Sequence, residues 1–241
     1  MFKALSAGSS EAQYRNLEND MDIFEKYKDY YDGPITRPQP TDFILEYFKN
    51  LQKGFFIDVG AHDGITWNNS LALSEFYKWN GICIEAHPQV FDILVKNRSE
   101  TDTCLNIGSH SEDGILTFRE ITGYSEMLSG FIKHYDPQHE DRINREISQY
   151  GGSCKEIEVP TERLETTLLK QNVNTVQYLS IDVEGSELQV LEGLNLRLNR
   201  PQLISIEDNG YTSEPHIFLQ DNKYRYLNKI AGDCFYEDSL L

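Results

Sequence analysis

Short apolar runs alternate with amphipathic stretches along the chain from residue 55 onward. Short apolar runs bounded by turn residues are typical of buried strands, whereas apolar side chains that recur every three or four positions indicate helices. We expect strands at residues 55–59, 81–85, 103–107, 115–121, 157–159, 178–182 and 203–207, with a closing strand pair within 223–237. We expect helices at residues 67–79, 88–98, around 164–168 and from 186 to 198. This alternation predicts an α/β fold with a parallel, doubly wound sheet.

The first 40 residues differ in character from the rest of the chain. Residues 11–31 are polar and charged, with apolar side chains spaced as on one face of a marginal amphipathic helix, and a proline-rich stretch follows. We therefore expect residues 1–40 to form an N-terminal helical extension that ends in a linker. Thr41 or Asp42 should then cap a short helix that runs to Leu51.

Residues 122–152 interrupt the alternation within the domain that we expect at residues 41–241. They are polar and rich in histidine, tyrosine and glycine, and they show no clear periodicity. We therefore expect an irregular insertion, and insertions over an α/β sheet commonly carry the substrate site. Its aromatic residues Tyr124, Phe131 and Tyr135 are expected either to stack on a substrate or to seal the core.

Polar residues stand at the ends of five predicted strands. They are Asp58, Glu85, Asn106, Asp182 and Glu207, and Asp208 and Asn209 follow the last of them. Each residue alone has a plain explanation, since a strand must emerge into water somewhere. In a doubly wound sheet, however, ligands bind beyond the carboxyl ends of the strands, so the joint pattern favours a binding site.

The loop after the first strand carries Asp58, Gly60 and Gly64 in the order Asp-x-Gly-x-x-x-Gly. Glycines allow a tight turn and a close approach of the backbone to a ligand, which indicates a nucleotide-type cofactor. The dinucleotide pattern G-x-G-x-x-G and the P-loop pattern G-K-[ST] are both absent. Asp58 is therefore expected to face a cationic group, and S-adenosylmethionine carries such groups.

The other strand ends supply further candidate cofactor contacts. Glu85 is placed to accept hydrogen bonds from ribose hydroxyls, a role that also exists in NAD enzymes. Asn106, or the backbone at Ile107 and Gly108, is placed to meet an adenine edge, and Asn69 is either a cofactor contact or a helix cap. The full candidate set is Asp58, Gly60, Ala61, His62, Asp63, Gly64, Asn69, Glu85, Ala86, Asn106, Ile107, Gly108 and Asp182.

Composition and charge limit the classes of partner that the protein can bind. The 241 residues are 39% hydrophobic and carry a formal net charge of −17, without a run of Lys and Arg, which argues against nucleic acid or anionic lipid as a partner. The four cysteines form no metal-binding pattern, the N-terminus resembles no secretory signal, and no segment approaches the roughly 20 apolar residues of a membrane span. We expect a cytoplasmic protein without a membrane span.

Three motifs together resemble the FkbM family of S-adenosylmethionine-dependent methyltransferases. They lie at residues 57–64, 85–88 and 180–187, and the Ile-Asp-Val-Glu-Gly-x-Glu block of the third is the most specific. The resemblance covers residues 41–237 and implies the class I methyltransferase fold, a Rossmann-like, mostly parallel seven-stranded sheet. It also implies methylation of hydroxyl groups on sugars and polyketide-type products. Two residues depart from the pattern: His62 stands where the glycine loop often has a third glycine, and Ala86 stands where the common motif Glu-Pro-x-Pro has its first proline.

Methyl transfer to a hydroxyl requires a group that accepts the hydroxyl proton. We predict that Asp182 or Glu184 is this base, because alternation along a strand turns both side chains to one side, and that Glu207 assists or orients the sugar. A second hypothesis adds Mg²⁺ or another divalent cation at Asp182, Glu207 and Asp208, since hard cations take oxygen ligands. The alternative is that Glu207 and Asp208 bind the substrate or cap a loop without a metal.

Other functional classes fit the sequence less well. A nicotinamide-dependent oxidoreductase is disfavoured by the missing G-x-G-x-x-G, and an inactive cofactor-fold binding module by the intact acidic set. No nucleophile elbow occurs, and the histidines show no metal-binding spacing; most of them, His139 included, are expected to be solvated in polar loops. We expect a carbohydrate or glycosylated small molecule as the acceptor. The proline-rich segment also suits a part of a larger multidomain glycan-modifying enzyme, and the oligomeric state stays open.

Overall fold

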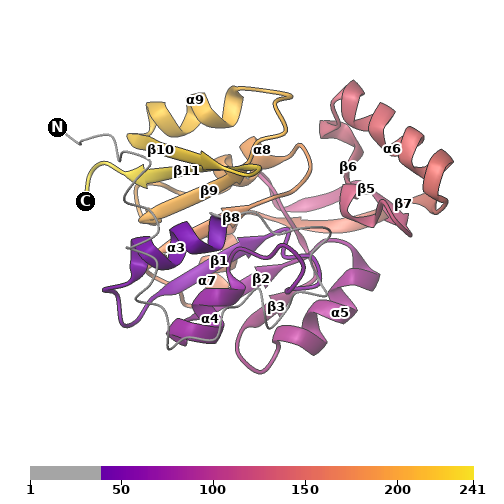
Figure 1. Cartoon of the computed structure of the whole chain (residues 1–241). Helices are drawn as coiled ribbons and strands as arrows, with labels where there is room; N and C mark the ends of the chain where they lie inside the picture. The colour runs from indigo at the N-terminus through magenta and orange to yellow at the C-terminus, as the bar shows by residue number, and fades with distance from the viewer. Residues whose placement is uncertain (1–38) are drawn as a thin grey trace, which may run out of the picture. The chain divides into compact units, whose positions relative to one another are not determined.

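The main sheet contains seven strands in the order β10-β11-β9-β8-β1-β2-β3 (Figure 1). The structure is a computed structural model that describes residues 39–241 of the chain. The strands of this sheet are β1 (Phe55–Val59), β2 (Asn80–Ile84), β3 (Thr103–Leu105), β8 (Tyr178–Ile181), β9 (Leu203–Glu207), β10 (Tyr224–Ile230) and β11 (Asp233–Asp238). The strands from β9 to β3 are parallel, whereas β11 is antiparallel to both β9 and β10. The expected α/β fold is confirmed, and the closing strand pair makes the sheet mixed.

The central strands are apolar throughout because the protein covers both of their faces. All residues of β8 and nearly all of β1 and β9 are buried, so the sequence shows continuous apolar runs instead of alternation. Ile57, Ile82, Leu179 and Ile204 from neighbouring strands lie in one core cluster. Because the carboxyl ends of these parallel strands meet at one edge, the sheet places their last residues beside one another.

Six of the helices accompany the main sheet. They are α3 (Pro40–Phe48), α4 (Leu71–Tyr77), α5 (Pro88–Arg98), α7 (Leu164–Lys170), α8 (Glu187–Glu192) and α9 (Glu214–Asp221). Helix α5 lies against β3 and α9 against β10 (Figure 1). Among residues 39–241, no helix combines the length and the apolar composition that crossing a bilayer requires.

Several helix boundaries differ from the expected ones. Helix α3 starts at Pro40, and Asp42 lies in its first turn, where its carboxylate accepts a hydrogen bond from the backbone nitrogen of Gln39 (2.9 Å). Helix α4 starts four residues later than expected, at Leu71, because polar contacts hold the preceding loop. Helix α8 is shorter than expected, and α9 was not expected at all. The helix expected within residues 11–31 lies outside the described residues.

The segment between β3 and α7 builds a second sheet with the order β4-β7-β5-β6. Its strands are β4 (Gly108–Ser109), β5 (Gly114–Thr122), β6 (Gly130–Phe131) and β7 (Ser153–Glu162), with two 3₁₀ turns, η3 (Glu126–Leu128) and η4 (Ile132–His134). Strands β5 and β7 pair antiparallel along the whole of β5. In Figure 1 this sheet and helix α6 (Pro137–Tyr150) stand together at one side of the main sheet.

The prediction of an irregular insertion at residues 122–152 was wrong, because α6 occupies much of it. The Asp136 side chain caps this helix by accepting a hydrogen bond from the backbone nitrogen of Gln138 (2.8 Å), and Pro137 takes the first helical position. Only His139 and Ile143 of the helix are buried. These two positions, four residues apart, were the sequence signal for a helix, but the polar composition of the segment obscured it.

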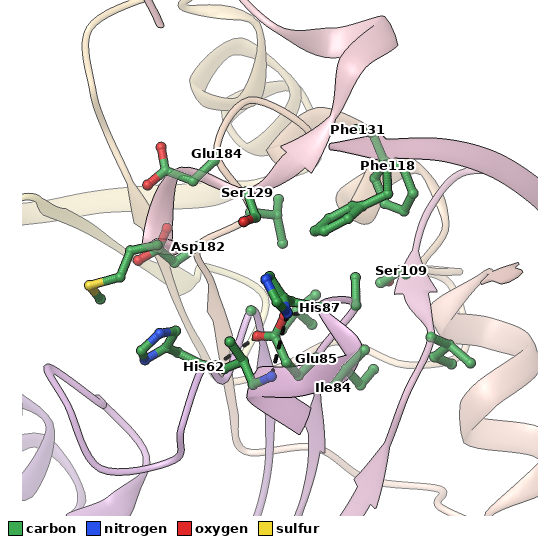
Figure 2. Close-up of a pocket in the computed structure, with 18 of the residues that line it drawn as sticks. His62, Ile84, Glu85, His87, Ser109, Phe118, Ser129, Phe131, Asp182 and Glu184 are labelled. Carbon is green, nitrogen blue, oxygen red and sulfur yellow. Dashed lines mark hydrogen bonds between the residues drawn. The ribbon is translucent and has the colours of Figure 1, made fainter. Parts of the chain in front are cut away.

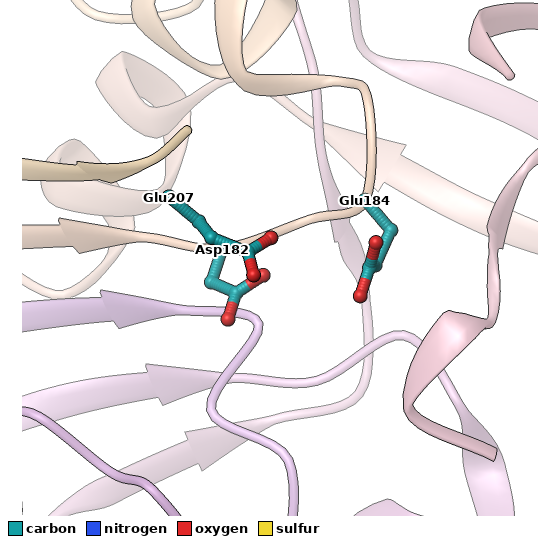
Figure 3. Close-up of side chains that lie close together, drawn as sticks. All are labelled: Asp182, Glu184 and Glu207. Atoms are coloured by element: carbon teal, nitrogen blue, oxygen red, sulfur yellow. The ribbon is translucent and has the colours of Figure 1, made fainter. Parts of the chain in front are cut away.

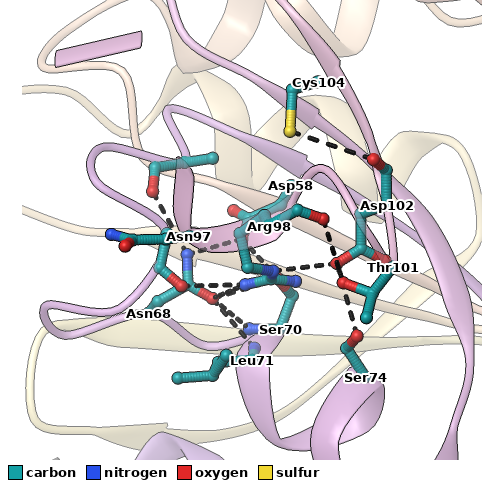
Figure 4. A network of polar contacts seen from close by, with 12 residues as sticks. Asp58, Asn68, Ser70, Leu71, Ser74, Asn97, Arg98, Thr101, Asp102 and Cys104 are labelled. Atoms are coloured by element: carbon teal, nitrogen blue, oxygen red, sulfur yellow. Dashed lines mark hydrogen bonds and ion pairs between the residues drawn. The ribbon is translucent and has the colours of Figure 1, made fainter. Parts of the chain in front are cut away.

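A buried guanidinium joins α5 to the loop between β1 and α4 (Figure 4). The Arg98 side chain is 2% exposed, and its Nε donates to Asp102 Oδ2 at 2.8 Å. Its Nη1 donates to the Gly64 carbonyl (2.9 Å) and to Asn68 Oδ1 (3.2 Å), and Nη2 donates to Ser70 Oγ (3.2 Å). A buried charge is tolerated when it is paired and fully hydrogen-bonded, as this one is.

The network extends to Asp58 at the end of β1. Ser70 Oγ donates to Asp58 Oδ2 at 2.6 Å, and Asn68 Nδ2 donates to the same oxygen at 2.8 Å. Burial raises the pKa of Asp58, while the hydrogen bond from Ser70 and the charge of Arg98 oppose this rise. The conformation of the loop after β1 therefore depends on a buried polar network, not on apolar packing alone.

Replacing Arg98 should be strongly destabilising. We expect Arg98→Met to lower the free energy of unfolding by about 3–5 kcal/mol, because it leaves buried carboxylates without their partner. Urea unfolding followed by circular dichroism measures the change. Lys49→Met, which removes an exposed ion pair with Glu46, is the matched control and should change stability by less than about 1 kcal/mol. Equal effects of the two substitutions would contradict this account.

Candidate functional site

A hollow of about 680 Å³, counted up to the open solvent at its mouth, lies beyond the carboxyl ends of β1, β2 and β8 (Figure 2). The main sheet contributes Gly60, His62, Ile84, Glu85, Ala86, His87, Asp182, Val183 and Glu184 to its lining. The segment that builds the second sheet contributes Gly108, Ser109, Phe118, Glu126, Met127, Ser129 and Phe131. The two sheets thus enclose one site.

Gly60 brings the loop after β1 into direct contact with the end of β8. Its φ is +81°, and a Cβ built on it would lie 1.6 Å from the carbonyl oxygen of Asp182. No other residue type fits such an approach. The next residue but one, His62, also has a positive φ of 49°, and its ring lies between Asp63 and Glu126, 3.6 Å and 3.5 Å away.

Four of the predicted cofactor residues have side chains that the protein itself engages. Asp58 points into the Arg98 network, and Asp63 accepts hydrogen bonds from the backbone of Ile65 and Thr66 (2.8 and 2.7 Å). Asn69 Nδ2 donates to Asp233 Oδ1 at 3.1 Å, and Asn106 Nδ2 donates to the carbonyl of Glu85 at 2.8 Å. None of the four belongs to the lining of the hollow. They fix the conformation of the loops that line the hollow. Gly64, which lies beside Arg98, has the same role.

Glu85 lines the hollow at the end of β2. Its Oε1 accepts a hydrogen bond from the His87 nitrogen (2.7 Å) and its Oε2 one from the His62 nitrogen (2.9 Å). Burial raises the pKa of Glu85, and these two bonds oppose the rise. Each carboxylate oxygen keeps a further lone pair, so Glu85 can still accept bonds from ligand hydroxyls.

His87, close to the end of β2, ties the two sheets together. Its Nε2 makes a hydrogen bond with the carbonyl of Ile121 on β5 at 2.9 Å, and its Nδ1 accepts one from the backbone nitrogen of Val90 at 3.4 Å. The side chain is 2% exposed. The sequence alone could not predict this role, because the hydrogen-bond partner lies 34 residues further along the chain.

Two carboxylates that line the hollow, Asp182 and Glu184, lie close to a third, Glu207, which lies outside its lining (Figure 3). Oxygens of Asp182, Glu184 and Glu207 lie within 4.8 Å of one another. Figure 3 shows Asp182 and Glu207 side by side at the ends of β8 and β9, with Glu184 facing them from the loop after β8. Glu184 has a φ of 55°, so a left-handed turn, and not the expected alternation along a strand, brings it to this side.

The grouping makes ionisation of these carboxyls costly. Asp182 is solvent-exposed, yet desolvation in the site and repulsion from Glu207 and Glu184 raise its pKa well above the ordinary value. Burial and repulsion from Glu207 likewise raise the pKa of Glu184. Perturbed carboxyls at the end of a hollow are typical of sites that accept protons or bind cations.

Asp208 does not belong to this group, contrary to the metal hypothesis drawn from the sequence. Neighbouring residues of a strand point to opposite sides, so Asp208 turns away from Glu207. Its Oδ2 pairs with Lys229 Nζ at 2.8 Å, and its Oδ1 accepts a hydrogen bond from the Gly210 nitrogen at 2.9 Å. Glu184 takes the third place in the cluster instead.

Helix α6 contributes a buried histidine beside the carboxylates. His139, which the sequence placed in a solvated loop, is fully buried, with Nε2 bonded to the carbonyl of Leu128 at 3.1 Å. Its Nδ1 lies 3.5 Å from Glu184 Oε2. Burial lowers the pKa of His139, so the neutral ring faces a carboxyl whose pKa is raised.

Comparisons with known proteins agree with this arrangement. A sequence profile of the methyltransferase FkbM domain matches residues 58–226. Methyltransferase sdnD of Sordaria araneosa is 25% identical in an alignment of 182 residues, and the match covers 64% of this chain and 66% of that relative. The chain therefore spans slightly less than two thirds of that relative's length.

Two solved structures share the fold. Methyltransferase FkbM from Methylobacillus flagellatus KT is 15% identical with a TM-score of 0.50, and the match covers 92% of this chain and 52% of that one. A Staphylococcus aureus protein described as a candidate caffeoyl-CoA O-methyltransferase is 8% identical with a TM-score of 0.51, and the match covers 97% of this chain and 100% of that one. At such low identity these likenesses concern the fold alone.

The pKa of Glu184 makes stability depend on pH. Between the unfolded pKa of about 4 and the raised folded pKa, the folded state binds more protons, so the wild type should lose stability as pH rises. Glu184→Gln cannot ionise and should unfold at a higher temperature than the wild type near pH 8, with the difference closing toward pH 4. Thermal unfolding in chelator-containing buffers tests this. Glu158→Gln, on the exposed part of β7, should follow the wild type, and a Glu184→Gln curve parallel to it would refute the expectation.

Proposed function

The chain belongs to the FkbM methyltransferase family, and we propose that it transfers a methyl group from S-adenosylmethionine to a hydroxyl of a sugar, in a glycan or a glycosylated small molecule. Methyl transfer is the activity of the family. The single observation that carries the finer proposal is that one hollow is lined by Glu85 and by Asp182 and Glu184, with Glu207 next to the latter two.

The residues of the hollow fit S-adenosylmethionine. Glu85 offers carboxylate lone pairs to ribose hydroxyls, and the acidic end containing Asp182 and Glu184 suits the cationic sulfonium and ammonium groups. When bound, this cofactor supplies a methyl group on a positively charged sulfur. The backbone of Gly60, His62 and Gly108 forms part of the wall of the hollow.

Glu184 and Asp182 are the proposed proton acceptors. A carboxylate whose pKa is raised binds a proton more strongly than an ordinary one, so it is a stronger base. His139 Nδ1 lies 3.5 Å from Glu184 Oε2 on the buried side, and Glu207 is placed to orient the acceptor. Carboxylates also accept pairs of hydrogen bonds from neighbouring hydroxyls, which supports a polyhydroxylated, uncharged acceptor.

A methyl-transfer screen over an oligosaccharide panel tests the proposal. We expect mass spectrometry to find one added methyl group on a sugar hydroxyl in the presence of S-adenosylmethionine. Glu184→Gln should lower kcat about 10²- to 10⁴-fold, because it removes a proton acceptor. The matched control Glu158→Gln should keep full activity.

Calorimetric titration with S-adenosylmethionine and with NAD separates the alternatives. Binding of NAD alone would contradict the proposal in favour of an oxidoreductase. Binding of neither would favour an inactive binding module. The first outcome also conflicts with the absence of G-x-G-x-x-G from the sequence.

A cation-assisted form of the reaction rests on the same carboxylates. Three oxygens within 4.8 Å of one another, from Asp182, Glu184 and Glu207, form an oxygen ligand set that suits Mg²⁺. A bound cation would relieve their mutual repulsion and lower the pKa of the acceptor hydroxyl.

Chelation distinguishes the two forms. If a cation takes part, excess EDTA should abolish methyl transfer and added Mg²⁺ should restore it. Full activity in excess chelator would exclude this form and leave the carboxylates as base and orienting groups. Calorimetry with Mg²⁺ alone provides a readout that does not depend on turnover.

A further inference from the structure

We propose that the second sheet forms the adenine wall of the cofactor site, through the rings of Phe118 on β5 and Phe131 on β6 and the hydroxyl of Ser109 on β4. The inference rests on the proposed function in one respect, that S-adenosylmethionine occupies the hollow. It assigns to the segment after β3 a role in holding the cofactor, where its sequence suggested a substrate-binding insertion.

The ring of Phe131 stands directly against the backbone of Gly108 at the start of β4, and the ring of Phe118 packs against it. A Cβ built on Gly108 would lie 2.2 Å from Cζ of Phe131, so the ring occupies the space that a side chain there would take. The rings of Phe118 and Phe131 are 5.3 Å apart at an angle of 78°, and each residue is only 4% exposed. Ala86, which follows Glu85, packs against the same cluster.

The position of these rings favours the nucleobase over the other parts of the cofactor. Figure 2 shows Phe118 and Phe131 side by side, across the pocket from Ile84 and Glu85, while Asp182 and Glu184 lie at a different side. The pocket is thus apolar beyond Glu85 and acidic at the carboxylates. A flat uncharged base suits the apolar end, and the cationic groups suit the acidic end.

An unpartnered hydroxyl marks the same end of the pocket. Ser109 is 4% exposed, lines the hollow, and its Oγ has no hydrogen-bond partner among the described residues. A buried hydroxyl without a partner costs free energy, so its presence in a wall indicates a ligand group that bonds to it. The polar edge of adenine offers both donors and acceptors, which a hydroxyl can match in either role.

Contacts between the second sheet and the main sheet hold this wall in place. His87 bonds to the Ile121 carbonyl at 2.9 Å, and this bond ties β5 to the end of β2. Glu126 on η3 lies 3.5 Å from His62 on the opposite loop. Because these contacts hold the second sheet against the main sheet, the aromatic surface is already in position to stack.

Calorimetry with S-adenosylhomocysteine tests the assignment. We expect Phe131→Leu and Phe118→Leu each to raise the Kd about five- to a hundred-fold, because leucine keeps the apolar packing and loses the stacking. Ser109→Ala should raise it by a smaller factor. The probe 5′-methylthioadenosine, which lacks the amino acid part, should show the same factors, since the loss lies at the nucleoside end.

Tyr124→Leu is the matched control. Tyr124 belongs to the same segment, is 62% exposed and stacks on Tyr150 with ring centroids 4.2 Å apart, outside the lining of the hollow. The Kd of the Tyr124→Leu variant for S-adenosylhomocysteine should equal that of the wild type. Thermal unfolding of all variants identifies any that do not fold.

Hydrogen exchange on the wild-type protein gives an answer that needs no variant. Saturating S-adenosylhomocysteine should slow amide exchange in β4, β5 and β6 as well as at the ends of β1 and β2. Protection of the main sheet alone, or unchanged Kd values in both phenylalanine variants, would overturn the inference and leave the proposed function intact. Failure of the wild type to bind S-adenosylhomocysteine would overturn both.

Discussion

The guanidinium of Arg98 is the constraint on which the site depends. It is buried, it pairs with Asp102, and its remaining donors hold the loop between β1 and α4 in one conformation. That loop carries Gly60 and His62 to the hollow. The position of this part of the hollow's lining therefore depends on the Arg98 guanidinium, which lies outside the hollow. Such a network is specific because each hydrogen bond fixes a direction, whereas apolar packing tolerates small shifts.

Electrostatic repulsion within the carboxylate cluster destabilises the folded state. Three acidic side chains converge where β8 and β9 end, and desolvation adds to their mutual cost. The rigid framework beneath them offsets the cost, as is common where function requires groups that destabilise the fold. A proton, a cation or a cationic ligand at this point relieves the repulsion, and this links occupancy of the site to the stability of the whole domain.

The sequence predicted the sheet well because buried parallel strands leave continuous apolar runs, and it located the site because such sheets bind ligands at one edge. It could not tell which side chains face the hollow. Asp58 and Asp208 stand at strand ends like Glu85 and Glu207, but a distant arginine and a lysine engage them. Helix α6 escaped notice because only His139 and Ile143 are buried, and the second sheet because its pairing joins residues far apart in sequence.

The contact between Gly60 and the carbonyl of Asp182 couples the positions of two motifs that are distant in sequence. The glycine loop and the Asp-Val-Glu-Gly segment are separated by more than a hundred positions in the chain, yet neither backbone can shift without displacing the other. A chimera that imports one motif from a relative must therefore import the other as well. For protein engineering, the unit of exchange at this site is the pair of loops, and the acceptor specificity has to be redesigned around it.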